Sequence, residues 1–228
     1  MASCPLVRVV SLVPSITETL LAWGIEPVAC TRFCEQPSFT HVGGTKNPDI
    51  DAIAALEPEI VLMNDEENRI EDHTALVDAG LDVHVVRINE LDDVNPALTA
   101  LAERLHVDFT PFRLPPVQPP TRRGFVPIWR RPWMTIGTGT YGSSVLTHIG
   151  VANVYAGDDK YPETTLDEVV SRRPDVVLAP SEPYPFRERH RTELETVAPV
   201  VFVDGQDLFW WGARTPAAIR RLGKALAP

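Results

Sequence analysis

The sequence lacks any apolar run of about 18 residues or more, the length that a helix needs to cross a bilayer. It has only three cysteines, Cys4, Cys30 and Cys34, which cannot form an even disulfide framework. Basic residues are in deficit, with 21 Lys and Arg against 31 Asp and Glu. We therefore expect no membrane span and no disulfide-stabilised secreted domain. The formal net charge of −10 also argues against nucleic acid as a partner, because an acidic surface repels phosphate.

The first residues lack the basic segment, apolar stretch and small-residue cleavage site of a secretory leader. Residues 7–13 already have the pattern of a buried strand. We therefore expect a cytoplasmic protein, or a periplasmic or otherwise extracytoplasmic one if a leader has been removed.

What the sequence does contain is a hydrophobic content of 44% spread over 228 residues, enough for a sizeable core. Short apolar segments rich in β-branched residues alternate with helical patterns. Strands are predicted at residues 7–13, 60–63, 83–88, 125–129, 176–178 and 200–203. This alternation is typical of α/β proteins with parallel sheets.

Capping residues mark where the intervening helices begin. Ser15 with Glu18, and Thr165 with Glu168, have the spacing of a capping box. Thr215, which precedes a proline, is predicted to cap the last helix.

The two halves of the chain repeat each other. Residues 51–62 align with residues 167–178 at a constant offset of 116, and both segments contain a helix, a proline, an acidic residue and a buried strand. We therefore expect an α/β fold of two similar Rossmann-like lobes with parallel sheets, residues 1–90 and 124–228, with a ligand cleft between them.

The crossover between the two lobes spans residues 91–123. Residues 91–105 have helical spacing, and residues 108–123 contain five prolines. Proline cannot continue a helix and favours an extended backbone. We therefore expect a short helix followed by an ordered, extended strap.

Ligand sites in open α/β sheets lie beyond the carboxyl ends of the strands. Two loops at such positions, residues 129–141 and 204–212, hold four of the five tryptophans. These side chains either pack beneath their own loops or stack on a ligand, and an exposed aromatic cluster favours the second interpretation.

Other motifs point less clearly to a function. Cys30, Cys34 and His41 offer a soft metal site that lacks an evident fourth ligand. Residues 137–142 match G-x-G-x-x-G but begin eight residues after a predicted strand, so they are a poor dinucleotide signature. No hydrolase signature or obvious acid/base pair is present, so we predict no catalytic residues and no resident metal or cofactor.

Several segments together resemble the cobalamin-binding and helical-backbone metal receptor family, whose relatives are the periplasmic substrate-binding proteins for cobalamin, haem and ferric siderophores. The resemblance rests on residues 8–18, 43–49, 56–62, 66–68 and 132–135. It implies a binding protein that holds a corrinoid or a related tetrapyrrole or metal chelate as its ligand. The family joins its lobes by a long helix, whereas this chain has the shorter helix and the proline-rich strap.

The resemblance also implies which residues meet the ligand. By position these are Phe33, Cys34, Asn64 and Glu67 in the first lobe, and Trp129, Trp133, Tyr141, Phe209 and Trp210 in the second. It further implies docking to an ABC transporter permease through an acidic residue on each lobe, for which Glu71 and Glu188 are the candidates. Two other functions stay open: an enzyme or chaperone that acts on such a ligand, and a ligand-sensing regulatory partner.

Overall fold

The computed structural model describes residues 7–226, so Cys4 lies outside the described residues. The chain divides into two compact units. The first runs to Ile88 and includes Asp93–Pro111, and the second comprises Asn89–Asp92 and the described chain from Phe112 onward. The predicted crossover is therefore shared between the two units.

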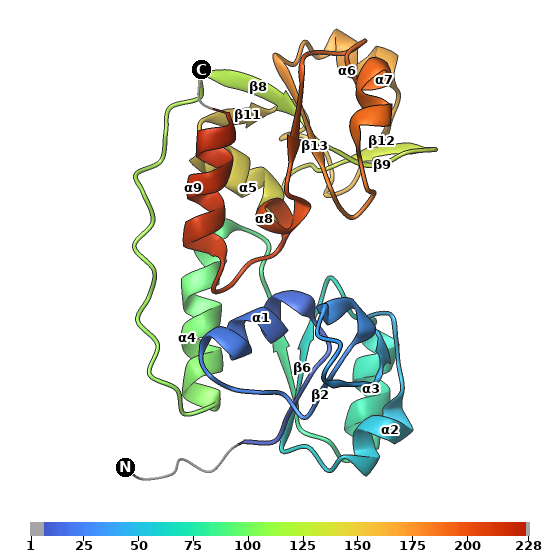
Figure 1. Cartoon of the computed structure of the whole chain (residues 1–228), viewed down its shortest axis with the longest axis vertical. Coiled ribbons are helices and arrows are strands. Elements are labelled where there is room, and N and C mark those ends of the chain that lie inside the picture. Colours follow the sequence, from blue (N-terminus) through green and yellow to red (C-terminus); the bar gives the residue numbers. More distant parts are fainter. Residues whose placement is uncertain (1–6, 227–228) are drawn as a thin grey trace. The chain divides into compact units, whose positions relative to one another are not determined.

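The first unit contains a five-stranded, fully parallel sheet with the order β3-β2-β1-β6-β7 (Figure 1). Its strands are β1 (Val9–Ser11), β2 (Ala29–Cys30), β3 (Thr40–His41), β6 (Ile60–Asn64) and β7 (Val83–Val86). Its helices are α1 (Pro14–Ala22), α2 (Ile50–Ala55), α3 (Ile70–Asp78) and α4 (Val94–Arg104), with the 3-10 turn η1 (Arg32–Cys34). A second 3-10 turn, η2 (Leu91–Asp93), spans the boundary between the two units. A small hairpin pairs β4 (Gly43–Gly44) with β5 (Asn47–Pro48). The predicted α/β class is confirmed for this half.

The second unit contains a four-stranded parallel sheet with the order β11-β8-β13-β14. Its strands are β8 (Arg122–Phe125), β11 (Val151–Asn153), β13 (Val176–Pro180) and β14 (Val200–Val203). An antiparallel sheet is formed by β9 (Pro127–Trp129), β10 (Trp133–Thr135) and β12 (Glu163–Thr164). The helices are α5 (Tyr141–His148), α6 (Leu166–Ser171), α7 (Arg191–Leu194), α8 (Gly205–Phe209) and α9 (Thr215–Ala225), with the 3-10 turn η3 (Glu188–His190).

The internal repeat predicted from the sequence is present in the strand order. In each unit the first strand of the parallel sheet lies between the sheet's next strand along the chain on one side and a later strand on the other. The matching orders are β2-β1-β6-β7 in the first unit and β11-β8-β13-β14 in the second. The core packing repeats as well. Ile53 of α2 and Val169 of α6, 116 residues apart, are both fully buried against their sheets.

Three local predictions are wrong. α1 has Val13 as its N-cap, so Ser15 lies inside the helix and forms no capping box. Thr215 is the first residue of α9, and its hydroxyl accepts from the backbone N–H of Gly212 instead of capping the helix. The strand predicted at residues 125–129 is two strands, β8 and β9, because Pro127 has no N–H with which to continue a ladder.

The proline-rich strap carries no helix or strand between residues 106 and 121. Its second half is nevertheless held by backbone hydrogen bonds, from Gln118 N–H to His148 O at 3.0 Å and from Thr121 N–H to Gly150 O at 2.9 Å. The strap approaches Gly150 so closely that a Cβ there would lie 2.8 Å from Pro119 O. This half of the strap therefore packs on the turn between α5 and β11.

Candidate functional site

The carboxyl edge of the first unit's sheet is organised by a buried side chain, Asn68. Its Nδ2 donates to Thr45 O at 2.8 Å in the β4–β5 hairpin and to Leu12 O at 3.4 Å after β1. Its Oδ1 accepts from the backbone N–H of Asn64 at 2.8 Å. One amide thus joins three loops at the edge where a ligand is expected. The sequence-based prediction missed Asn68 as an organising residue, although residues 66–68 had been singled out.

Asn64, predicted to meet the ligand, uses its side chain within the protein. It is 2% exposed, its Nδ2 donates to Val86 O at 3.0 Å, and its Oδ1 accepts from the N–H groups of Glu66 and Glu67. These bonds shape the turn that follows β6. Glu67, also predicted, is half-buried on that turn.

Phe33 lies on η1 after β2 and is 50% exposed, which makes it one of the most exposed large apolar side chains of the described chain. The guanidinium carbon of Arg32 lies 4.8 Å from the centre of its ring. The ring also approaches Gly44, where a Cβ would be only 2.9 Å from Phe33 Cε2. Phe33 therefore has a fixed position and a large exposed area.

Cys34, the next residue, is buried and 3% exposed. Its sulfur accepts a hydrogen bond from Thr17 Oγ1 at 3.2 Å and lies 3.3 Å from Thr31 Oγ1. The structure thus directs this predicted ligand residue inward. The soft-metal alternative is not formed: His41 Nε2 lies 3.0 Å from Gln36 O, and residues 7–226 hold no group of three His, Cys, Asp or Glu arranged around a metal.

In the second unit, aromatic side chains gather after β8 and β13. We call Trp129, Trp133, Tyr184, Phe186 and His190 the aromatic cluster. Trp129 is 45% exposed and meets Tyr184 edge to face at 5.6 Å between centroids, while Trp133 stacks on Phe186 at 6.0 Å with 8° between the planes. Tyr184 also contacts Phe186 and His190. Phe186 and His190 are buried within the cluster, whereas Trp129 keeps a large exposed area that is suited to stacking on a flat ligand.

Tyr184 and Phe186 were missed by the sequence-based prediction. They lie in the Pro-Tyr-Pro-Phe segment at residues 183–186, directly after the buried strand β13. Aromatic residues in a loop that follows a parallel strand are the available signal. In the second lobe, the sequence-based prediction names only residues of the two tryptophan-rich loops.

The loop after β14 places Phe209 and Trp210 at the end of α8, both half-buried. The Arg214 guanidinium lies 5.1 Å from the Trp210 ring centre and bonds to the buried carboxylate of Asp207 at 3.2 Å. Arg221 also pairs with Asp207. Trp211, in contrast, is 4% exposed and belongs to the core. Trp211 therefore packs in the core, whereas Trp210 is half-buried beside the Arg214 guanidinium.

Tyr141, also predicted to meet the ligand, is 5% exposed at the start of α5. Its hydroxyl lies 3.0 Å from Thr215 Oγ1, and burial raises the pKa of Tyr141 above its ordinary value. Gly142 follows, and Phe209 packs within 3.2 Å of the place where its Cβ would be. The glycine pattern at residues 137–142 is thus explained by close packing at Gly137 and Gly142 and by the positive φ of 63° at Gly139.

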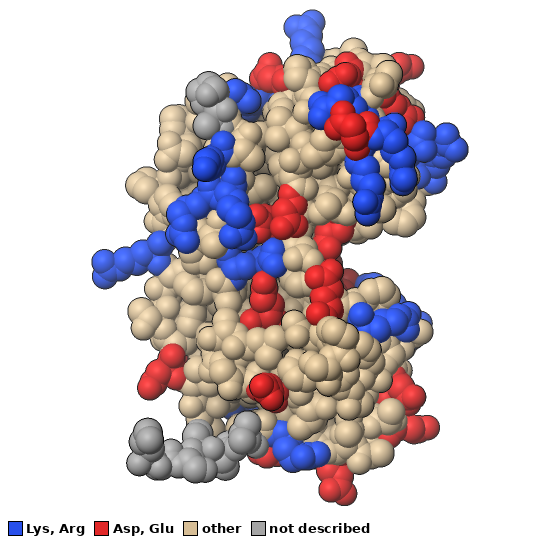
Figure 2. Space-filling model, viewed as in Figure 1, with Lys and Arg blue, Asp and Glu red and all other residues tan. Residues whose placement is uncertain are grey.

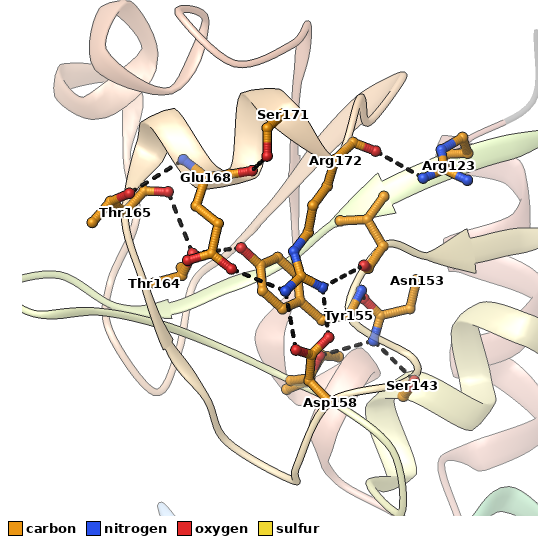
Figure 3. A network of polar contacts seen from close by, with 12 residues as sticks. Arg123, Ser143, Asn153, Tyr155, Asp158, Thr164, Thr165, Glu168, Ser171 and Arg172 are labelled. Atoms are coloured by element: carbon orange, nitrogen blue, oxygen red, sulfur yellow. Dashed lines mark hydrogen bonds and ion pairs between the residues drawn. The ribbon is translucent and has the colours of Figure 1, made fainter.

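A polar network supports this unit beside β11 (Figure 3). Arg172 bonds to both carboxylate oxygens of Asp158 and to Glu168, and its guanidinium covers the Tyr155 ring at 3.8 Å. These hydrogen bonds, Asp158 first, raise the pKa of Arg172. Asn153 bonds to Ser143 Oγ and Ile136 O. The network fixes the loops around β11 and is internally satisfied, so we assign it a structural role.

Charged side chains are unevenly distributed. Figure 2 shows basic side chains gathered over α9, which contributes Arg220, Arg221 and Lys224. No helix within residues 7–226 has both the length and the apolar character to span a bilayer.

Comparisons with known proteins bear on this arrangement. No protein-family model matches the chain. The chain is 23% identical over 189 residues to a vitamin B12-binding protein of Salmonella paratyphi A, covering 75% of this chain and 71% of that one.

Solved structures match more of the chain. The periplasmic vitamin B12 binding protein of Vibrio cholerae superposes with a TM-score of 0.77 at 19% identity, covering 97% of each chain. A periplasmic heme-binding protein solved with two hemes gives a TM-score of 0.76 at 21% identity, covering 96% of this chain and 99% of that one. Two of these three are described as periplasmic, so they give no support to the cytoplasmic prediction. All three are named as binding proteins, which does not favour the enzyme or chaperone alternative. The resemblance found in the sequence is confirmed, and the chain has the two-lobed α/β fold of the periplasmic binding proteins.

Proposed function

We propose that this protein binds a corrinoid, or a related tetrapyrrole or metal chelate, at the carboxyl edges of its parallel sheets. The proposal is supported by the fold and by the vitamin B12 and heme ligands named for its relatives. The observation that carries it is the exposure of fixed aromatic rings at those edges, Phe33 at 50% and Trp129 at 45%. Stacking on such rings is a common way to hold a flat macrocycle.

The nine predicted residues divide into two groups in this proposal. The partly or largely exposed ones meet the ligand directly: Phe33, Glu67, Trp129, Trp133, Phe209 and Trp210. Cys34, Asn64 and Tyr141 are buried and hold the loops from which the others project. Tyr184 joins the first group through its contact with Trp129.

We further propose that the protein works outside the cytoplasm and delivers its ligand to an ABC transporter permease. Glu71, exposed in the first turn of α3, and Glu188, exposed in η3, are the proposed docking residues. Arg191 binds the Glu188 carboxylate through two hydrogen bonds and lowers its pKa, so Glu188 keeps its negative charge. Replacing both glutamates by arginine should abolish ligand uptake by cells and leave binding by the purified protein unchanged.

The binding proposal is tested by titrating the purified protein with cyanocobalamin and, separately, with haemin, followed by absorbance and calorimetry. We expect saturable, one-to-one binding of one of them. Trp129→Ala should weaken that binding by about 1–3 kcal/mol, or roughly 5- to 150-fold in Kd. The control is Val170→Ala, which truncates another exposed apolar side chain, 45% exposed on α6. Failure of both ligands to bind, or equal effects of the two variants, would contradict the proposal.

A further inference from the structure

A groove of about 320 Å³ lies wholly within the second unit. It is lined by one face of α5 with the glycine loop before it, by residues 90–92, and by Val117 of the strap. None of the nine residues predicted to meet the corrinoid or chelate lines it. Its volume is at the lower end of the range of about 300–1,000 Å³ that is usual for small-molecule sites.

Three hydroxyl side chains of α5 and its N-cap line this groove, those of Thr140, Ser144 and Thr147. Each donates its single proton to a backbone carbonyl oxygen three or four residues earlier in the chain, at 3.0, 2.8 and 3.1 Å respectively. What these hydroxyls retain for a ligand is therefore acceptor lone pairs. Thr140 and Thr147 are seven residues apart, which corresponds to about 10 Å along a helix.

Two carboxylates add further acceptors. Glu90 and Asp92, both exposed, flank Leu91 and line the groove. The N–H of Leu91 donates to Ser144 Oγ at 2.7 Å, which ties this segment to α5. Because an ionised carboxylate only accepts hydrogen bonds, the lining favours a ligand that is rich in donors and positively charged.

His148, the last residue of α5, also lines the groove. Its Nε2 is buried and has no hydrogen-bond partner among residues 7–226. Unpaired buried polar atoms are rare in folded proteins. This end of the groove is therefore a place where a hydrogen-bonding partner is missing.

An anion is a poorer match, although the N-terminus of a helix by itself favours negative charge. The Thr140 hydroxyl already accepts from a backbone N–H of the first turn of α5 at 3.3 Å. The carboxylates of Glu90 and Asp92 would repel a further negative charge. Lys160 passes near the glycine loop, but its ammonium group bonds to Asn89 Oδ1.

We propose that this groove binds an aliphatic polyamine. Its ammonium groups donate to the hydroxyls of α5 and to the carboxylates of Glu90 and Asp92. Its methylene chain packs against Val117, whose side chain is 64% exposed. The acceptors of α5 extend over about 10 Å, which suits a chain that carries amines along its length. The proposal does not depend on the proposed function, because the two sites share no residue.

The test titrates the purified full chain with spermidine by calorimetry, with Mg²⁺ and inorganic phosphate as separate probes. We expect saturable, one-to-one binding of spermidine that weakens as the salt concentration rises, and no binding of phosphate. Mg²⁺ controls for the general attraction of cations to a protein with a net charge of −10. An equal concentration of Mg²⁺ should leave spermidine bound.

Two variants with matched controls locate the site. Asp92→Asn should raise the Kd for spermidine about 3- to 10-fold, and Thr147→Val about 2- to 10-fold. The controls lie on α3: Asp78→Asn removes another exposed carboxylate, and Thr74→Val removes an exposed hydroxyl that donates to Ile70 O at 3.0 Å. Neither control should change the Kd.

Circular dichroism on each variant confirms that it is folded. Failure of spermidine to bind, its displacement by Mg²⁺, or binding of phosphate in its place would overturn the proposal. Equal losses in the variants and their controls would do the same. Spermidine binding that weakens only in Asp92→Asn and Thr147→Val supports it, even if neither cyanocobalamin nor haemin binds to the protein.

Discussion

The two units share a clamp at the amino ends of their sheets. In the first unit Arg8 donates to the carbonyl oxygens of Leu56 and Glu57, and its backbone N–H donates to Glu59 Oε1. In the second unit the same three bonds run from Arg123 to the carbonyls of Arg172 and Arg173 and to Asp175 Oδ2. Even the strained residue repeats, with φ of 47° at Glu57 and 52° at Arg173.

The opposite edges have diverged. At the offset of 116 residues, Asn64 and Asn68 of the first unit correspond to Pro180 and Tyr184 of the second. Amides that tie loops together are thus replaced by a rigid residue and an aromatic ring. The comparison teaches that the scaffold edge was kept while the edge expected to meet the ligand was free to change.

The largest expected effect tests whether the cores of the two units are equivalent. It concerns Leu62 and Leu178, which lie at matching places in β6 and β13 and are both 0% exposed. Each change to alanine should cost about 2–5 kcal/mol, because it leaves a cavity in a packed core. Urea unfolding of the two variants would measure the losses. A cost below about 1 kcal/mol in one unit alone would break the equivalence.

The diverged edge is tested by Asn68→Ala and Tyr184→Ala. The first should cost about 1–3 kcal/mol, because it leaves the Asn64 N–H and the Thr45 carbonyl without their partner. It should also raise hydrogen exchange in residues 64–68. Tyr184→Ala should lower stability less and instead weaken ligand binding. A reversed pattern would contradict the assignment of roles.

The clamps give a smaller, paired prediction. Arg8→Ala and Arg123→Ala should each cost about 1–2 kcal/mol, because both arginines are exposed and water replaces some of the lost bonds. Thermal melts can compare them, with Arg113→Ala, an exposed residue of the strap, as the control. If only one of the two variants loses stability, the two arginine clamps are alike in geometry but not in their contribution to the free energy of unfolding.

The smallest effect concerns pH and the second unit alone. Burial, and then the positive charges of Arg189 and Arg130, lower the pKa of His190 below its ordinary value of 6.5. As the pH falls, His190 is therefore protonated in the unfolded chain at a higher pH than in the folded protein. The contribution to stability is complete above about pH 6.5 and is lost as the pH falls toward the folded pKa. His190→Gln should flatten this acid slope, as measured by urea unfolding at pH 7 and pH 5. An unchanged slope would contradict the assignment.

The sequence supported the fold well because its signals are local and repeated. Buried strands such as β6 and β13 are continuous β-branched or apolar runs, and the offset of 116 residues predicted their equivalence. The antiparallel sheet of β9, β10 and β12 was missed. Its strands have two or three residues each, too few for an alternating pattern, and its pairing joins distant segments.

The candidate site was only partly predictable. Trp129 is 45% exposed at the end of β9, as a residue that meets a ligand would be, but the sequence did not predict how deeply each tryptophan is buried. Trp210 and Trp211 are adjacent, and only Trp211 is buried in the core. Cys34 and Tyr141 were expected at the ligand and lie inside. Burial depends on what the rest of the fold places opposite a side chain, and a single sequence does not record that.

The docking of the strap has a practical consequence for anyone who wishes to produce the second unit by itself. A fragment that starts at Gly124 would begin in the middle of β8 and lose the arginine clamp. It would also leave the carbonyl groups of His148 and Gly150 without the donors that Gln118 and Thr121 supply. A fragment that starts near Phe112 keeps all of these bonds, so the proline-rich segment is better treated as an outer layer of this unit than as a tether to be trimmed.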